Sequence, residues 1–299
     1  MPDERKPSVV AIIGASSGIG LATAQACAAR GDHLLLGSRS EQALAAAASS
    51  CTQLGAASVR HQVLDVTDAE TVRDFFDTAG AAAGRLDAVV HTAATMAYGR
   101  LTELDPAIFA GVTRTAIEGT YAVATHALAV FGRQRSGTLV VVNSLVGSIA
   151  APQMGAYVTA KWGQAGLLRT LQLETAGAPG IRVCSIAPGG VNTPIYRQAA
   201  NVTGRSAKPP VPVDQPEKVA AAIVRCLDQP RDRVSVGLAN HLIRFGFQAV
   251  PWLYDRMVGP LMHLLSLTGE PTEPSTGNVL APAPQGEALR GPWTRRWST

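Results

Sequence analysis

The strongest constraint on the fold is a regular alternation of short apolar runs with longer segments of helical composition. A strand buried on both faces of a sheet reads as a continuous apolar run, and parallel strands need a crossover connection that is usually a helix. We expect strands at 8–13, 33–37, 59–64, 86–90, 139–142, 181–186 and 234–237. We expect helices at 21–30, 41–54, 68–83, 105–131 (as one helix or two), 156–176 and 216–227. The pattern predicts an α/β fold with a doubly wound parallel sheet in three layers, helices covering both faces. No internal linker divides residues 8–237, so we expect one domain there.

A glycine-rich turn joins the first strand to the first helix. It reads Gly14-Ala15-Ser16-Ser17-Gly18-Ile19-Gly20. Glycines let backbone N–H groups approach a pyrophosphate, which then sits at the positive end of the following helix. A glycine cluster alone is often only a turn, but its place between strand and helix favours a dinucleotide phosphate site.

The end of the second strand carries Ser38 and Arg39. In dinucleotide-binding folds the adenosine ribose lies at this point, where an acidic residue would bind the 2′-hydroxyl of NAD. A hydroxyl and a guanidinium suit a 2′-phosphate instead. We therefore expect NADP(H), with NAD(H) the less favoured cofactor. The alternative is that Arg39 is a solvated surface residue.

Three further strand ends carry candidate cofactor contacts. Asp65, followed by Val66, could accept a hydrogen bond from the adenine amino group, or could only cap the next helix, for which Thr67 and Asp68 are better placed. Small residues after the fourth strand would leave room for a ribose of the cofactor. After the sixth strand, a turn fixed by prolines and glycines could contact the nicotinamide amide. The residues expected to contact the cofactor at these two places are Thr92, Ala93, Pro188, Gly189, Val191 and Thr193.

Tyr157 and Lys161 are four residues apart, and Ser144 follows the apolar strand 139–142. On a helix, residues at this spacing lie on one face, one turn apart. An ammonium group there favours the phenolate, so we expect the pKa of Tyr157 to fall towards neutrality. Such a phenol could exchange a proton with a carbonyl or alcohol oxygen, and the Ser144 hydroxyl could hold the same oxygen. The spacing is also common by chance, so its weight comes from the phosphate-binding turn.

Composition excludes several other classes of protein. Charged residues make up 16% of the chain and the net charge is +4, with no basic block suited to nucleic acid. Four cysteines far apart, with no Cys-x-x-Cys pair, indicate a reducing compartment, and we expect a cytoplasmic protein. The six histidines are scattered, so we expect no metal site. The stretch 1–7 is charged and lacks the apolar core of a signal peptide.

Over residues 8–237 the chain resembles the short-chain dehydrogenase/reductase family. The motifs that carry the resemblance are Gly14-x-x-x-Gly18-Ile19-Gly20, Asp65-Val66, Ser144, Tyr157-x-x-x-Lys161 and Pro188-Gly189, in the family's order and spacing. The resemblance implies a Rossmann-type fold and hydride exchange between a nicotinamide and a carbonyl or secondary alcohol. It implies that Tyr157 is the acid/base, that Ser144 positions the substrate oxygen, and that Lys161 binds the nicotinamide ribose. We expect an apolar small-molecule substrate and a homodimer or homotetramer.

Three positions depart from the family's pattern. Ile13 replaces the usual Thr, and His91-Thr92-Ala93-Ala94 replaces Asn-Asn-Ala-Gly. The catalytic-site Asn that anchors a water in the proton relay is Ala116 here, with Thr113, Thr115, another group or a water as substitutes. These departures keep open an alternative, a dinucleotide-binding protein of the same fold with weak or no catalysis.

Residues 238–299 exceed what this fold needs. The apolar part 238–267 is interrupted by Pro251 and Pro260, and we expect helices that pack on the domain or on a partner subunit. A lid over an apolar substrate and a membrane-surface anchor of a lipid oxidoreductase are the alternatives. The part 270–299 is rich in proline and predicts extended chain, while the polar segment 196–213 is a candidate mobile lid.

Overall fold

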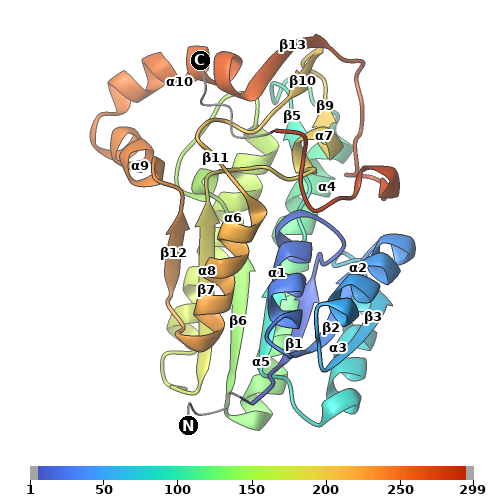
Figure 1. Cartoon of the computed structure of the whole chain (residues 1–299). Coiled ribbons are helices and arrows are strands. Elements are labelled where there is room, and N and C mark those ends of the chain that lie inside the picture. Colours follow the sequence, from blue (N-terminus) through green and yellow to red (C-terminus); the bar gives the residue numbers. More distant parts are fainter. Residues whose placement is uncertain (1–5, 294–299) are drawn as a thin grey trace.

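The computed structural model describes residues 6–293, apart from the side chains of residues 80–83. Its centre is a seven-stranded parallel sheet (Figure 1). The strands, in the order in which they lie side by side, are β12 (Arg233–Val236), β7 (Ile181–Pro188), β6 (Gly137–Val142), β4 (Ala88–His91), β1 (Val9–Ile13), β2 (His33–Ser38) and β3 (Ser58–Val63). The order reverses between β1 and β4, so the carboxyl ends of these strands form the crevice where such sheets bind ligands. The predicted Rossmann-type fold is confirmed.

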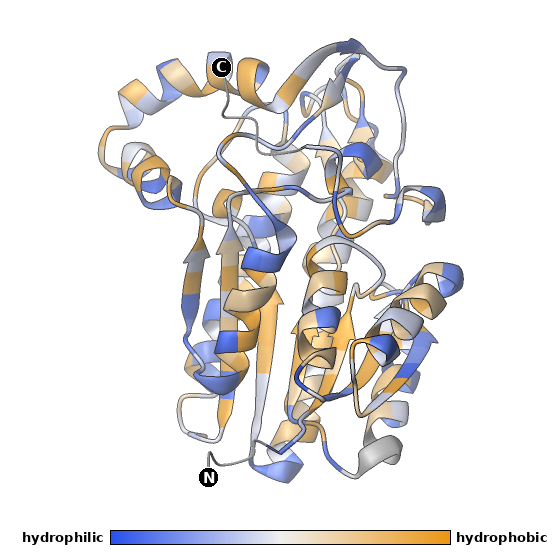
Figure 2. Cartoon of the chain, in the orientation of Figure 1, coloured by the Kyte–Doolittle hydropathy of each residue, from blue (hydrophilic) through white to orange (hydrophobic). Residues whose placement is uncertain are grey.

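Helices cover both faces of the sheet. One face packs against α1 (Gly18–Ala28), α2 (Glu41–Gln53) and α8 (Pro216–Asp228) through one apolar core. The other packs against α3 (Ala69–Ala83), α5 (Glu118–Gln134) and α6 (Gly155–Glu174) through a second. Figure 2 shows the central strands as largely apolar, between helices that carry both apolar and polar residues. The continuous apolar strands β1, β4 and β6 follow from this burial on both sides.

The predicted helical segment 105–131 is two helices, α4 (Pro106–Ala116) and α5. Asp105 starts α4, because its carboxylate accepts the N–H of Ala107 at 2.7 Å. Ile117, with φ −93° and ψ −63°, stands between the two helices, and its N–H still donates to the carbonyl of Thr113.

The polar segment 196–213 is tied down by small two-stranded sheets. After α7 (Ile195–Gln198), β9 (Ala200–Asn201) pairs with β5 (Ala97–Tyr98), β10 (Arg205–Ala207) with β13 (Leu267–Pro271), and β11 (Val213–Asp214) with β8 (Gly190–Val191). These pairings join the segment to the body and to the C-terminal extension, where the sequence suggested a free loop.

The C-terminal extension begins with two helices, α9 (Asn240–Ala249) and α10 (Pro251–Ser266), which overhang the carboxyl end of the sheet (Figure 1). After β13 the chain passes α7 towards the start of α1 and includes the short 3₁₀ helix η2 (Pro284–Gly286). Within residues 6–293 no helix is long and apolar enough to cross a membrane. The predicted extended chain at 294–299 lies outside the described residues.

Candidate active site

The glycine-rich turn between β1 and α1 is packed too closely for side chains. A Cβ on Gly14, whose φ is +84°, would lie 2.6 Å from the hydroxyl oxygen of Thr92, and one on Gly20 would lie 2.0 Å from the Gly14 carbonyl oxygen. Thr92 locks the turn by donating to the carbonyls of Ile13 (2.9 Å) and Gly14 (3.2 Å). This role was not expected from the sequence.

The N-terminus of α1 has no side-chain cap and no acidic residue in its first turn. Its first N–H groups therefore face the groove without a side-chain acceptor, the arrangement that attracts phosphate groups. Ser16, Ser17, Gly18 and Ile19 line the groove at this point. The residues thus fit the pyrophosphate of a dinucleotide.

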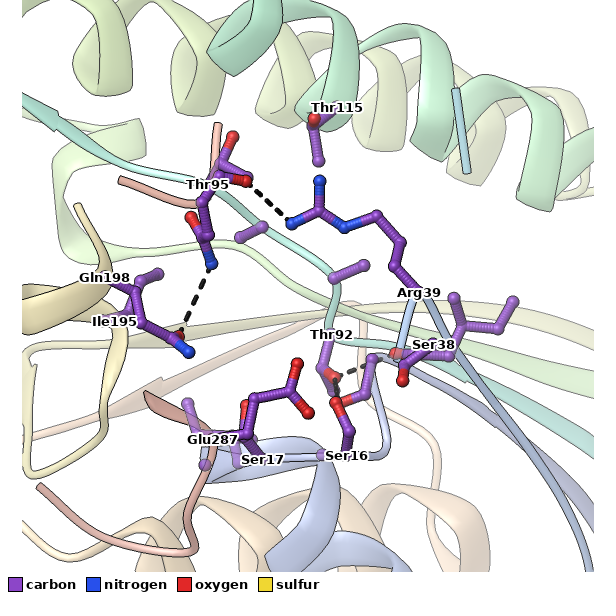
Figure 3. Close-up of a pocket in the computed structure, with 18 of the residues that line it drawn as sticks. Ser16, Ser17, Ser38, Arg39, Thr92, Thr95, Thr115, Ile195, Gln198 and Glu287 are labelled. Carbon is purple, nitrogen blue, oxygen red and sulfur yellow. Dashed lines mark hydrogen bonds between the residues drawn. The ribbon is translucent and has the colours of Figure 1, made fainter. Parts of the chain in front are cut away.

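Ser38 and Arg39 line the same groove from the end of β2, as predicted for the adenosine subsite (Figure 3). The guanidinium of Arg39 donates to the carbonyl of Asn278 in the C-terminal extension at 2.8 Å, so it is not a freely solvated group. Asp65 and Val66 also line the groove. Asp65 accepts hydrogen bonds from the N–H (2.8 Å) and hydroxyl (2.7 Å) of Thr67.

Of the cap candidates for the following helix, the structure uses Asp68 and not Asp65. Asp68 caps α3 by accepting from the N–H groups of Glu70 and Thr71. Asp65 does not cap that helix through its own side chain, and its carboxylate remains at the groove wall.

Ser144, Tyr157 and Lys161 line a second cavity that opens into the dinucleotide groove. Tyr157 and Lys161 lie one turn apart near the start of α6, as their spacing predicted, and both are buried. The ammonium nitrogen of Lys161 lies 5.7 Å from the centre of the Tyr157 ring. The predicted nicotinamide-side residues Thr92, Pro188, Gly189, Val191 and Thr193 line the same cavity, and Ala93 lines the groove.

Asn143 joins the end of β6 to α6. Its side-chain oxygen accepts the N–H of Ser144 at 2.6 Å, and its nitrogen donates to the carbonyl of Lys161 at 3.1 Å. The buried amide therefore fixes Ser144 relative to the helix that carries Tyr157. Its position directly before Ser144 was the only signal in the sequence.

Burial reverses the pKa change expected for Tyr157. The pKa is raised by loss of solvation and by the neighbouring Tyr196, while a side-chain hydrogen bond from Ser144 lowers it by less. The expectation of a lowered phenol pKa is therefore wrong for this structure. Burial instead lowers the pKa of Lys161 to about 7. Tyr157 is protonated at neutral pH, the form that can donate a proton.

Gln164 links Lys161 to the end of α4, where the family's pattern has Asn and this chain has Ala116. It lies one turn after Lys161 and is fully buried. Its amide nitrogen donates to the Thr120 hydroxyl (2.7 Å) and the Ala116 carbonyl (3.4 Å), and its oxygen accepts from Lys161 at 2.9 Å. The predicted substitutes Thr113 and Thr115 bond back to carbonyls of their own helix.

Lys161 also donates to the carbonyl of Val142 at 3.0 Å. An ammonium group has three donors, so two are held by the protein and one remains for a further acceptor. Behind this group lies His91, whose two ring nitrogens are buried with no hydrogen-bond partner among the described residues. Burial and then the charge of Lys161 lower the pKa of His91 to about 3, so the imidazole is neutral.

The second cavity has a volume of about 600 Å³ and a mostly apolar wall. α9 and α10 supply one side of it, through Leu242, Phe245, Leu253, Tyr254, Met257 and Leu261. Met96, Ile149, Met154 and Tyr196 supply the body side. Among the described residues no group of three His, Cys, Asp or Glu side chains is placed to hold a metal ion.

Fold and site together define a dinucleotide-binding α/β oxidoreductase. A family model described as short chain dehydrogenase matches residues 8–202. The chain therefore belongs to the short-chain dehydrogenase/reductase family, as the motifs predicted.

Individual relatives agree with this assignment. Cis-4-hydroxycyclohexanecarboxylate dehydrogenase of Sinomonas cyclohexanicum is 34% identical over 72% of this chain and 87% of its own length. The uncharacterized oxidoreductase YxnA of Bacillus subtilis is 28% identical over 96% of this chain and 81% of its own length. The structure of an alcohol dehydrogenase from Thermococcus sibiricus, in complex with 5-hydroxy-NADP, has a TM-score of 0.68 at 29% identity. The structural match covers 77% of this chain and 96% of the Thermococcus sibiricus chain.

Proposed function

We propose that this protein is an NADP(H)-dependent oxidoreductase that interconverts a carbonyl and a secondary alcohol on an apolar small molecule, with Tyr157 as the acid/base. The observation that carries the proposal is the position of Tyr157 and Ser144 in the wall of an apolar cavity that joins the dinucleotide groove. Ile19, Thr92 and Thr193 line both spaces, so a ligand in the groove would reach the two hydroxyls.

The bound nicotinamide would supply hydride in reduction and take it up in oxidation. For reduction, the Ser144 hydroxyl donates a hydrogen bond to the substrate oxygen and Tyr157 transfers its proton to that oxygen. The raised pKa of Tyr157 keeps this proton in place at neutral pH. Lys161, held by Gln164 and Val142, would use its remaining donor to hold the cofactor ribose.

The preference for NADP(H) is supported by the chemistry at the end of β2. Ser38 and Arg39 stand there, and Ser16 lines the groove beside them. Neither Ser38 nor Arg39, which end and follow β2, has the acidic side chain that would bind a 2′-hydroxyl. The NADP derivative in the Thermococcus enzyme is in keeping with this choice.

The wall of the cavity supports an apolar substrate. A pocket of about 600 Å³ falls in the range of small-molecule sites, which is about 300–1,000 Å³. The test is NADPH oxidation against a panel of ketones and aldehydes, comparing wild type with Tyr157→Phe. Turnover by wild type that the variant lacks would support the proposal, and equal rates would overturn the assigned acid.

A membrane-surface lipid oxidoreductase is a second candidate. It is favoured by large apolar side chains on the extension that point away from the cavity, Leu238 (91% exposed), Trp252 (70%) and Leu264 (68%). Flotation with liposomes, comparing wild type with Leu238→Ser/Trp252→Ser, decides it. Equal flotation of the wild type and this variant would contradict the membrane-surface function.

A further inference from the structure

The C-terminal segment 278–293 borders the dinucleotide groove, whose wall includes Asn278 and Glu287. The carbonyl of Ala288 accepts the N–H of Gly18 at 2.9 Å, and the carbonyl of Asn278 accepts from Arg39 at 2.8 Å. Gly18 begins α1 and Arg39 follows β2, so each donor belongs to a subsite assigned above to a phosphate of the cofactor. The segment has therefore taken one donor from each subsite.

Glu287 places a carboxylate among the same groups. Figure 3 shows its side chain pointing into the groove near Ser16, and it lines the groove with Arg39. Burial raises the pKa of Glu287, while the Ser16 side chain and the charge of Arg39 lower it by less. One of its carboxylate oxygens is buried with no hydrogen-bond partner among the described residues. An anionic group thus stands where Ser16 and Arg39 would meet a 2′-phosphate.

Contacts after Glu287 hold the segment across the groove. Arg290 forms an ion pair with Glu217 at the start of α8. The N–H of Trp293 donates to the side-chain oxygen of Asn192 at 3.2 Å. The Trp293 ring packs edge-on against Tyr196, with ring centres 5.5 Å apart. The segment is therefore anchored on the nicotinamide side as well as on the adenosine side.

The segment leaves little room beside it. The remaining groove has a volume of about 140 Å³, below the range of about 300–1,000 Å³ for sites of drug-sized ligands. A dinucleotide is larger than such ligands and must also reach the N–H groups of α1. The segment therefore narrows the part of the groove next to Ser16 and Arg39.

We propose that the segment 278–293 is an internal ligand of the dinucleotide groove, with Glu287 and the Ala288 carbonyl taking the places of cofactor phosphates until the cofactor displaces them. The inference rests on the proposed function in taking the groove as the NADP(H) site. When only a fraction of molecules is open, the apparent dissociation constant is the intrinsic one divided by that fraction. Loosening the segment should then tighten binding of NADPH and NADH by the same factor.

The test uses the full-length chain and measures dissociation constants for NADPH and NADH by calorimetry. Glu287→Gln removes the internal anion, and Arg290→Ala removes an anchor outside the groove. Both variants should bind NADPH and NADH at least about fivefold more tightly than wild type does. This factor is the lower end of the typical range for coupling between two binding sites. Because the two substitutions change the charge in opposite directions, a general electrostatic effect on an anionic ligand would shift their affinities in opposite directions. Glu273→Gln, an exposed position before the segment, is the matched control and should bind as wild type does.

Three outcomes would overturn the inference. Unchanged affinity in both variants would show that the segment does not compete. Weaker binding would show that it holds the cofactor in place. Tighter NADPH but weaker NADH binding in Glu287→Gln would show that Glu287 stays and binds the 2′-hydroxyl.

Hydrogen exchange gives a second readout, because peptides from 278–293 should lose protection when NADPH saturates the protein. Greater protection would contradict displacement.

The proposed function and this inference can fail independently of each other. No carbonyl turnover, with these affinity changes present, would contradict the proposed function alone. Turnover that depends on Tyr157, with affinities unmoved, would contradict only this inference.

Discussion

Gln164 accepts a hydrogen bond from the ammonium group of Lys161 at 2.9 Å, and both side chains are buried on α6. The same amide donates to Thr120 and to the carbonyl of Ala116, where the family's pattern has Asn. A side chain from α6 thus links α4 and α5 to the lysine. The departure at Ala116 therefore does not leave Lys161 unsupported.

Gln164→Leu should lower kcat of carbonyl reduction about tenfold, because Lys161 loses the acceptor that orients it; tenfold corresponds to about 1.4 kcal/mol. Steady-state kinetics with NADPH and one ketone measure the effect. Gln172→Leu, two turns further along α6 and hydrogen-bonded to Val183 and Asp232, is the control and should keep kcat. Adding Ala116→Asn to a Gln164→Ala variant should restore part of the rate. An unchanged kcat in Gln164→Leu would contradict this role.

Lys161→Met should change how stability depends on pH. The pKa of Lys161 is about 7 in the folded protein and ordinarily 10.5, so between these pH values the unfolded chain binds more protons. Wild-type stability should therefore rise with pH relative to the variant, by at most about 1.4 kcal/mol per pH unit between pH 7 and 10. Denaturant unfolding of both proteins across this range measures the difference, and parallel curves would show that Lys161 is not neutralised by burial.

Arg39→Ala should weaken NADPH binding about tenfold more than NADH binding, because a charge-assisted hydrogen bond to the 2′-phosphate is lost. The ratio of the two dissociation constants is the measure. Loss of the Arg39 contact to Asn278 also loosens the C-terminal segment, but that change affects both cofactors equally. An equal change in the dissociation constants for NADPH and NADH would contradict the assignment of Arg39 to the 2′-phosphate.

Leu261→Ser should raise KM for a long-chain methyl ketone about fivefold, equivalent to ~1 kcal/mol of lost apolar contact, and change KM for a short one less. Leu261 lines the cavity and is 39% exposed, so the substitution should cost little stability. Leu264→Ser is the control, since Leu264 is on the same helix but outside the cavity wall. If the two variants behave alike, α10 does not contact the substrate.

The sheet and the position of the glycine turn could be predicted from the sequence because both depend on local patterns. Apolar runs of strand length mark β1, β4 and β6, and the glycines Gly14, Gly18 and Gly20 mark the turn directly after β1. The Tyr157 and Lys161 spacing likewise follows from helix geometry.

What the sequence did not predict depends on packing between distant segments. Gln164 matters only because α6 lies against the end of α4 at Ala116. The contact of Ala288 with Gly18 joins residues 270 positions apart, and no periodicity marks it. The raised pKa of Tyr157 follows from burial and then from the nearby Tyr196, and neither is marked in the sequence around Tyr157. Such effects require the complete three-dimensional arrangement.

The central claim is that the Tyr157 hydroxyl transfers the proton at the substrate oxygen. Its most direct test is single-turnover reduction of a ketone by enzyme-bound NADPH in wild type and Tyr157→Phe, with the dissociation constant for NADPH measured in parallel. The account predicts a rate lower by about 10²- to 10⁴-fold in the variant, the usual contribution of general acid catalysis, with NADPH affinity within about twofold of wild type. A variant that reduces the ketone at the wild-type rate would contradict it.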